Sequence, residues 1–123
     1  MQFKLTVCLL AIAMGTFTLA ASAAEWERAI SLEQALKAAD TAAGFPKGRP
    51  SDYDVVTAKL IRSKYFHVSN EGLSGALSDM ESLSPSRVFW LIVYGRWPPR
   101  LDSDLVVFID ANTGKTIRVY RQK

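Results

Sequence analysis

Three apolar stretches near the C-terminus decide the fold of this chain: RVFWLIVYGR (residues 87–96), SDLVVFIDA (103–111) and KTIRVYR (115–121). Each stretch is short, rich in β-branched and aromatic residues, and bounded by turn-forming residues, which is typical of a β-strand. Asn112-Thr113-Gly114 joins the second stretch to the third, and Gly114 can supply the positive φ that a tight hairpin requires. We therefore predict a three-stranded antiparallel meander.

The first two of these strands are apolar on both faces, because successive side chains of a strand point to opposite sides. In the first strand the two sets are Val88, Trp90, Ile92 and Tyr94 against Phe89, Leu91 and Val93. In the last strand, alternation sets Ile117 and Val119 against Thr116, Arg118 and Tyr120. A contiguous exposed apolar face is a liability in a monomer, so each face needs a covering layer. A helix covers one face, and the candidates for the other are residues 69–86, a second copy of the chain, or a binding partner.

A helix is predicted from Ser31 to Ala43. Ser31 is a good N-cap and Gln34 stands three residues later, so the two side chains form a capping box. Apolar residues then recur at helical spacing and form a narrow stripe, made of Leu32, Ala35, Leu36, Ala39 and Ala43. Gly44 suits the left-handed position after a helix, and Pro46 prevents continuation.

The region between this helix and the meander contains a further predicted strand, Tyr53–Arg62, which continues through Tyr65, Phe66 and Val68. Alternation within it separates two sets of residues: Val56, Ala58 and Leu60 against Val55, Thr57, Lys59 and Ile61. Residues 69–86 are rich in Ser and Gly, although Leu73, Leu77 and Met80 recur at near-helical spacing, so a mobile loop and a weak amphipathic helix are both compatible with them. We expect a loop that contains about two turns of helix.

The order of the predicted elements, a helix followed by strands, is typical of the α+β class. We expect one N-terminal helix packed on a curled antiparallel sheet of about four strands.

The first 23 residues differ from the rest in composition, since 16 of them are apolar against 44 of the remaining 100. Lys4, an apolar run over residues 5–13 and the small residues Ala21-Ser22-Ala23 together form the pattern of a secretory signal peptide. We expect cleavage between Ala23 and Ala24. The mature chain, residues 24–123, would then be a single periplasmic or secreted domain with no membrane span.

Two segments of the mature chain resemble the PepSY domain family. One is the helix at residues 30–39 (ISLEQALKAA), with alanine at position 35. The other is the closing hairpin at residues 106–117 (VVFIDANTGKTI), which follows a strand with Trp and Tyr and whose turn reads Asp-Ala-x-Thr-Gly. The resemblance extends from Ile30 to Tyr120, and residues 69–86 are longer than the family pattern. It implies a cystatin-like fold, an extracytoplasmic location and a role in restraining or regulating proteolysis, and it supplies no catalytic residue.

The turn of this hairpin also has a structural interpretation of its own. The Asp110 carboxylate can accept the backbone N–H of Asn112 or Thr113, as in an Asx turn, and Gly114 can adopt the positive φ. We expect Asp110, Asn112, Thr113 and Gly114 to stabilise the turn.

The sequence predicts neither an enzyme nor a metal or cofactor site. His67 is the only histidine and lies in an apolar run typical of a strand, so we expect a structural or solvent-facing role. The only cysteine, Cys8, lies within the predicted signal peptide, which leaves the mature chain no disulfide and no Cys-based site. The formal net charge is +3, or +2 without residues 1–23, and the absence of a long basic block argues against a nucleic-acid partner.

The clearest candidate for partner binding is the tip between the first two strands of the meander, formed by Arg96, Trp97, Pro98, Pro99 and Arg100. Trp and Arg are enriched at interface hot spots, and two prolines limit the entropy lost on binding. The alternative is structural: Trp97 folds back on the core and the prolines cap the strands.

These features lead us to expect an exported, non-catalytic, PepSY-like binding module that regulates or inhibits a peptidase or binds another envelope protein. One alternative is a self-associating structural protein, which forms a homodimer through the second apolar face of the sheet. Another is a carrier of a small apolar ligand, with residues 69–86 as a lid over the pocket.

Overall fold

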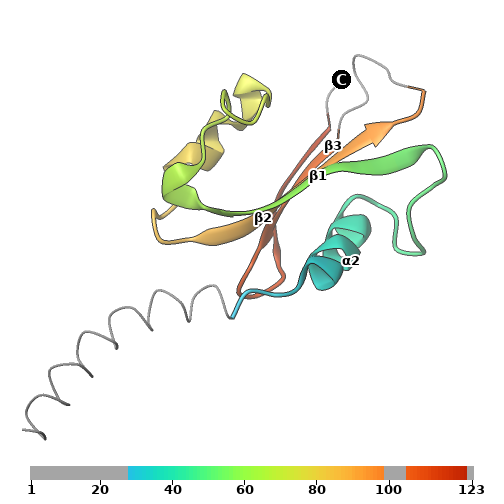
Figure 1. Ribbon diagram of the computed structural model, residues 1–123, viewed down its shortest axis with the longest axis horizontal. Helices are drawn as coiled ribbons and strands as arrows, with labels where there is room; N and C mark the ends of the chain where they lie inside the picture. The colour runs from blue at the N-terminus through green and yellow to red at the C-terminus, as the bar shows by residue number, and fades with distance from the viewer. Residues whose placement is uncertain (1–27, 99–104, 122–123) are drawn as a thin grey trace, which may run out of the picture.

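The computed structural model describes residues 28–98 and 105–121. An α-helix, α2 (Leu32–Ala42), is followed by strand β1 (Tyr53–Arg62), two 3₁₀ helices, η1 (Ser63–Tyr65) and η2 (Gly75–Ser82), and strands β2 (Val88–Arg96), β3 (Leu105–Asp110) and β4 (Thr116–Arg121). The four strands form one antiparallel sheet in the order β1-β2-β3-β4. Figure 1 shows α2 on one side of the curled sheet and the segment with η2 on the other. The predicted α+β class, a helix on a four-stranded antiparallel sheet, is confirmed.

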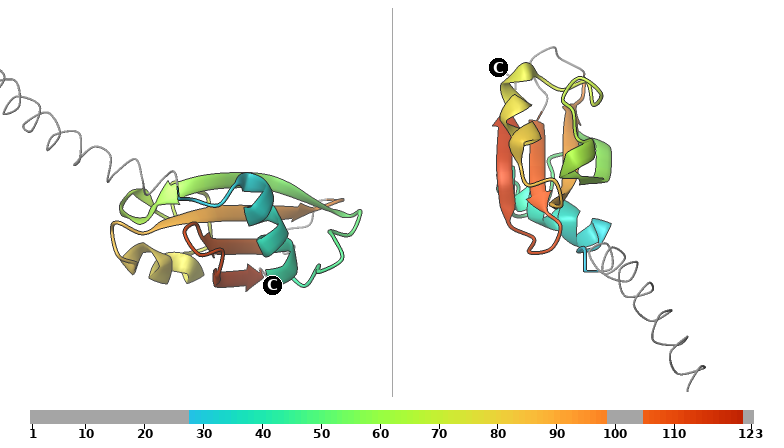
Figure 2. Two further views of the ribbon diagram at one scale, coloured as in Figure 1. Left: turned by 90° about the horizontal axis from the view of Figure 1, so that it is seen from below. Right: turned by 90° about the vertical axis from the view of Figure 1, so that its left-hand side faces the viewer.

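The ends of α2 follow from the sequence. The backbone N–H of Gln34 donates to Ser31 Oγ at 3.1 Å, and the N–H of Ser31 donates to Gln34 Oε1 at 2.9 Å, so the predicted capping box is present. Gly44 has a φ of 92° just after the helix. Ala35 and Ala39 are fully buried, and their small side chains let the helix approach the sheet closely as it crosses the strands (Figure 2).

The face of the sheet under α2 holds the first half of the core. Its buried side chains come from the helix and from β2 and β3: Ala35, Ala39, Ala43, Ile92, Tyr94, Leu105, Val107 and Ile109. These strand residues alternate with those of the opposite face, as the period of two in a strand predicts.

The opposite face is covered by the chain itself. Phe66, Leu77 and Met80 lie in a buried cluster with residues of the sheet, namely Ile61, Phe89, Leu91, Val106 and Phe108. The rings of Phe66, Phe89 and Phe108 meet edge to face, with centroids 5.5–5.6 Å apart. Of the three candidates for this layer, the structure shows the chain's own segment. The apolar surface that suggested a homodimer, or a pocket under a lid, is therefore already packed against this segment.

The path of this covering segment differs in part from prediction. A continuation of β1 through Tyr65, Phe66 and Val68 is wrong, because the strand ends at Arg62 and η1 turns the chain so that Phe66 enters the core. The expected helical turns are present at Gly75–Ser82, but as a 3₁₀ helix. Three residues per turn place Leu77 and Met80, three apart, on the same side, where both are buried.

Register shifts in both edge strands correct the predicted alternation. In β1 the shift lies between Val55 and Thr57, so Val55 joins Ala58 on the α2 face and Val56 stays 67% exposed. In β4 the shift lies next to Ile117, which packs on the opposite face from Val119. An extra residue in one strand reverses the side to which the following residues point. A prediction from simple alternation of side chains does not contain this reversal.

Within the described ranges, 28–98 and 105–121, no helix is both long enough and apolar enough to span a membrane.

Candidate functional site

The end of the β1–β2 pair carries the side chains that sequence analysis selected for partner binding. Arg96, Trp97 and Pro98 are described there, whereas Pro99 and Arg100 lie outside the described residues, as does the predicted signal peptide. Trp97 follows the last residue of β2 directly, and its side chain is 69% exposed. The alternative in which Trp97 folds back on the core is therefore wrong.

Asp52 fixes the backbone beneath this tryptophan. The N–H of Trp97 donates to the carbonyl oxygen of Asp52 at 2.6 Å, and Nε of Arg96 donates to the Asp52 carboxylate at 2.8 Å. The Arg96 guanidinium also lies over the ring of Tyr53, 5.8 Å from its centroid. Arg96, which the sequence offered as a contact for a partner, therefore acts within the chain and holds the segment before Trp97 in place.

A layer of aromatic rings supports Tyr53 in turn. Phe45 lies 5.1 Å from Tyr53 and 6.1 Å from Tyr94, measured between ring centroids. The hydroxyl of Tyr94 donates to Asp40 Oδ1 at 2.7 Å and so ties β2 to α2. Burial, followed by the hydrogen bond and the negative charge of Asp40, raises the pKa of Tyr94 above its ordinary value. The backbone under Trp97 is thus connected to the packed interior.

Val56 adds a second exposed apolar side chain at the same end of the strand pair. It is the residue left out of the register between Val55 and Thr57, and its Cγ2 lies over Gly95. We call Val56, Trp97 and Pro98 the Trp97 surface. Sequence analysis missed Val56 because alternation alone placed it with Ala58, and Gly95 within β2 was the one signal of a close approach there.

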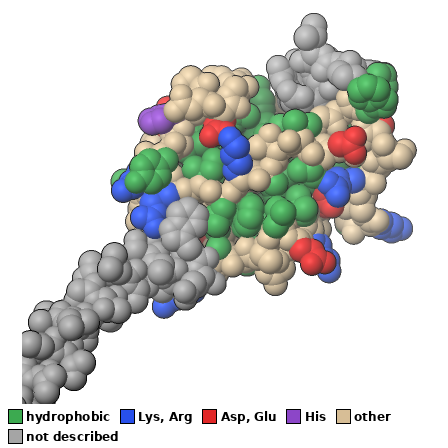
Figure 3. All heavy atoms as spheres, in the orientation of Figure 1, with side chains coloured by type: hydrophobic (Ala, Val, Ile, Leu, Met, Phe, Trp, Pro, Cys, Tyr) green, Lys and Arg blue, Asp and Glu red, His purple; other side chains and the backbone are tan. Residues whose placement is uncertain are grey.

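Figure 3 shows the molecule from the side of β1, with hydrophobic side chains in the middle and Lys, Arg, Asp and Glu around them. Among residues 28–98 and 105–121, two further large apolar residues are exposed elsewhere. Leu32 is 45% exposed at the start of α2, and Tyr65 is 66% exposed at the opposite end of the β1–β2 pair from Trp97. Tyr65 therefore provides a natural comparison for Trp97.

The β3–β4 turn has the hydrogen bonds expected of an Asx turn. Oδ1 of Asp110 accepts the N–H of Asn112 at 2.9 Å and that of Thr113 at 3.0 Å, and Gly114 has a φ of 74°. Oδ2 accepts Nε of Arg87 at 3.1 Å. Burial acts to raise the pKa of Asp110, but the bonds from Asn112, Arg87 and Thr113 outweigh it and hold the pKa below its ordinary value. These contacts give the turn residues a structural role.

His67, for which the sequence predicts a structural or solvent-facing role, lies beside Glu81, with 3.9 Å between Nδ1 and Oε1. The same Glu81 oxygen accepts the backbone N–H of Val68 at 2.8 Å, which fits a structural contact that ties η2 to the chain before it. In the described part of the chain, no group of three or more His, Cys, Asp and Glu side chains is arranged to hold a metal ion.

Comparison with models of protein families, with curated proteins and with solved structures gave no match to this chain.

Proposed function

We propose that this protein is a non-catalytic binding module that recognises another protein through the Trp97 surface. One observation carries the proposal: a tryptophan that is 69% exposed stands on backbone fixed by Asp52 and Arg96. Tryptophan is among the residues most enriched at the hot spots of protein interfaces.

Rigidity beneath the exposed side chain strengthens this argument. A contact residue on a mobile loop loses conformational entropy on binding, whereas a residue on fixed backbone loses less. The Asp52–Arg96 contacts and the Phe45, Tyr53 and Tyr94 rings hold the backbone before Trp97. Val56, which is 67% exposed and lies over Gly95, adds a second apolar side chain near this end of the strand pair, and interface cores are enriched in such residues.

The class of partner follows from the resemblance to PepSY domains and from the predicted signal peptide. Both favour an extracytoplasmic partner, and the resemblance favours a peptidase whose activity the module restrains. The experiment is an inhibition assay of secreted and envelope peptidases with the exported protein, its Trp97→Ala variant and its Tyr65→Ala variant. We expect inhibition by the wild type and by Tyr65→Ala and a loss of inhibition with Trp97→Ala. Equal inhibition by all three proteins would contradict the assignment to the Trp97 surface.

A further inference from the structure

Asp54, Val56 and Trp97 surround Gly95 on one face of the sheet. Asp54 of β1 stands directly opposite Gly95 of β2 in the antiparallel pair. The N–H of Trp97 donates to the carbonyl oxygen of Asp52, which continues the same register one pair beyond the end of β2. Trp97 therefore follows Gly95 on the same face, two residues later, and Asp54 is its diagonal neighbour.

This register brings the Asp54 carboxylate within reach of a group that contacts Trp97. Residues directly opposite in an antiparallel pair have Cβ atoms about 4.5–5.5 Å apart, and diagonal neighbours lie about 7–8 Å apart. Gly95 has no side chain, and Val56 Cγ2 lies beside it, 2.8 Å from where a Cβ at position 95 would stand. A carboxylate and an exposed aromatic ring therefore flank one apolar side chain, with no β2 side chain between them.

The charge of Asp54 is not neutralised by the described part of the chain. Asp54 is exposed and has no ion-pair partner within residues 28–98 and 105–121. The guanidinium of Arg96 is turned to the other face, since it lies over Tyr53, which packs with the α2 side of the core. Further along the same face of β1, Lys59 is already paired with Glu71 at 2.8 Å. A negative charge therefore remains beside the exposed tryptophan.

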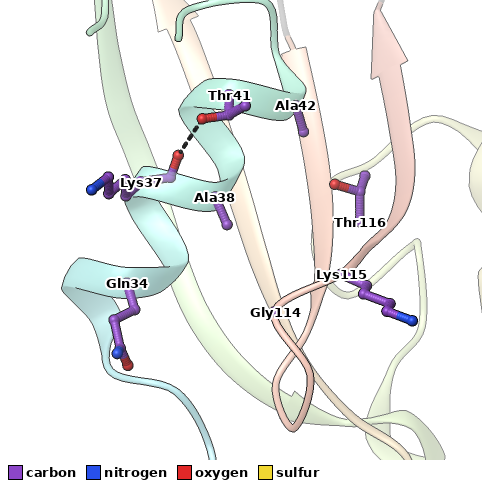
Figure 4. A pocket seen from close by; sticks show the side chains of 8 residues that line it. All are labelled: Gln34, Lys37, Ala38, Thr41, Ala42, Gly114, Lys115 and Thr116. Carbon is purple, nitrogen blue, oxygen red and sulfur yellow. Dashed lines mark hydrogen bonds between the residues drawn. The ribbon is translucent and has the colours of Figure 1, made fainter. Parts of the chain in front are cut away.

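An open groove on the α2 side of the sheet does not present its charges in this way. The groove lies between α2 and the start of β4 and has a volume of about 530 Å³. Figure 4 shows the side chains of Lys37 and Lys115, which belong to its lining, pointing away from it on opposite sides. The groove therefore turns neither charge toward a ligand, unlike the face around Gly95.

We propose that the partner of the Trp97 surface presents an arginine, whose guanidinium lies over the Trp97 ring and pairs with the Asp54 carboxylate. This inference rests on the proposed function and adds the chemistry of the partner. A planar guanidinium stacks on aromatic faces and donates to a carboxylate from its edge, so a single group makes both contacts. Val56 offers an apolar contact to the methylene groups of the arginine stem.

The test follows the indole N–H signal of Trp97 by NMR while two peptides are added to the full protein. The peptides are acetyl-Val-Arg-Val-amide and acetyl-Val-citrulline-Val-amide, and citrulline has nearly the shape of arginine without its charge. The signal is assigned by its absence from Trp97→Ala. We expect the arginine peptide to bind at least about fivefold more tightly, and added salt to reduce this preference because the ion pair is exposed.

Asp54→Asn separates the contribution of the carboxylate from that of the ring. We expect this variant to lose most of the preference for arginine and to bind the citrulline peptide as the wild type does. The matched control is Glu33→Gln, which removes the same charge from an exposed residue of α2, on the other side of the sheet. This control should keep the preference of the wild type.

Three peptide results would overturn the inference: no shift of the Trp97 signal, equal affinities of the wild type for the two peptides, or the same preference in Asp54→Asn as in the wild type. Capture of envelope proteins separates this inference from the proposed function. A protein retained by the wild type and by Asp54→Lys, but not by Trp97→Ala, would overturn the role of Asp54 and leave binding through the Trp97 surface standing. Equal retention of every protein by all three would contradict the proposed function itself.

Discussion

Val56 lies over Gly95 so closely that a Cβ at position 95 would stand 2.8 Å from Val56 Cγ2. The register shift of β1 occurs at this point, where Asp54 pairs with Gly95, Val55 with Tyr94 and Thr57 with Val93. The bulge and the glycine therefore depend on each other. Together they place the exposed side chain of Val56 near the end of β2, which Trp97 follows directly.

This contact predicts the effect of Gly95→Ala. Real Cβ atoms do not approach another carbon to 2.8 Å, so Val56 or the backbone has to move. We expect the free energy of unfolding to fall by about 1–3 kcal/mol, the usual range for overpacking. Urea denaturation followed by circular dichroism measures this change.

A double-mutant cycle with Val56→Ala identifies the cause. Because Val56 is 67% exposed, its removal alone should change stability by less than about 0.5 kcal/mol. In the Val56→Ala background, Gly95→Ala should be nearly neutral. An equal loss in both backgrounds would place the strain elsewhere.

Tyr94→Phe tests the link between β2 and α2. The variant loses the hydrogen bond to Asp40, and we expect a loss of about 1.5–3 kcal/mol, typical of a bond to a charged group. The raised pKa of Tyr94 adds a dependence on pH. The unfolded chain ionises near pH 10, before the folded one, so the stabilisation is complete below about pH 10 and is lost as the pH rises above it.

The control for this prediction compares how the free energy of unfolding changes with pH in the wild type and in Tyr94→Phe. Between pH 9 and pH 11 the wild type should lose more stability than Tyr94→Phe does. Parallel decreases in the two proteins would show that the hydroxyl does not distinguish the folded from the unfolded state.

Asp110→Asn tests the β3–β4 turn. The amide has no charge to attract the N–H groups of Asn112 and Thr113 or the Arg87 guanidinium, so we expect a loss of about 1–3 kcal/mol at pH 7. Since the pKa of Asp110 is lowered in the folded state, its contribution is present above about pH 4 and is lost as the pH falls through the folded-state value.

Asp79→Asn is the matched control, because its bond to Arg118 lies at the surface and 56% of the Asp79 side chain is exposed. We expect this variant to change stability by less than about 1 kcal/mol. Asp110→Asn should show a smaller dependence of stability on pH below pH 4 than the wild type does. A steeper acid dependence in Asp110→Asn than in wild type would contradict the assignment.

Leu77→Ala tests whether residues 69–86 truly cover the second face of the sheet. Leu77 is fully buried against the cluster of Phe66, Phe89 and Phe108, so we expect a loss of about 2–5 kcal/mol. Leu32→Ala, at a residue 45% exposed, should cost much less. Binding of the dye ANS should rise in Leu77→Ala alone, and a neutral effect there would mean that another layer covers this face.

The sequence predicted the helix and the strands well because each has a strong local signal. The capping box at Ser31 and Gln34 and the glycine at position 44 defined α2, and the Asx turn at Asp110 defined the β3–β4 hairpin. The structure of the covering segment, residues 69–86, was harder to predict. Leu77 and Met80 are three apart, a spacing shared by α- and 3₁₀-helices, so only the contacts with Phe89 and Phe108 select its structure.

The candidate site was predictable only in part. Trp97 and its prolines stood out by residue type, but the roles of Asp52 and Arg96 depend on the register of β1 against β2. Nothing local in the sequence sets that register. The exposed position of Val56 likewise follows from one extra residue in β1.

Capture of envelope proteins on immobilised wild type, Trp97→Ala and Tyr65→Ala, quantified by mass spectrometry, tests the binding proposal most directly. Both substituted residues are exposed aromatics, 69% and 66%, so neither change should disturb the fold. We predict a partner protein that wild type and Tyr65→Ala capture in equal amounts. Trp97→Ala should capture at most about one tenth of that amount. Retention of the same proteins at the same levels by wild type and Trp97→Ala would contradict binding through the Trp97 surface.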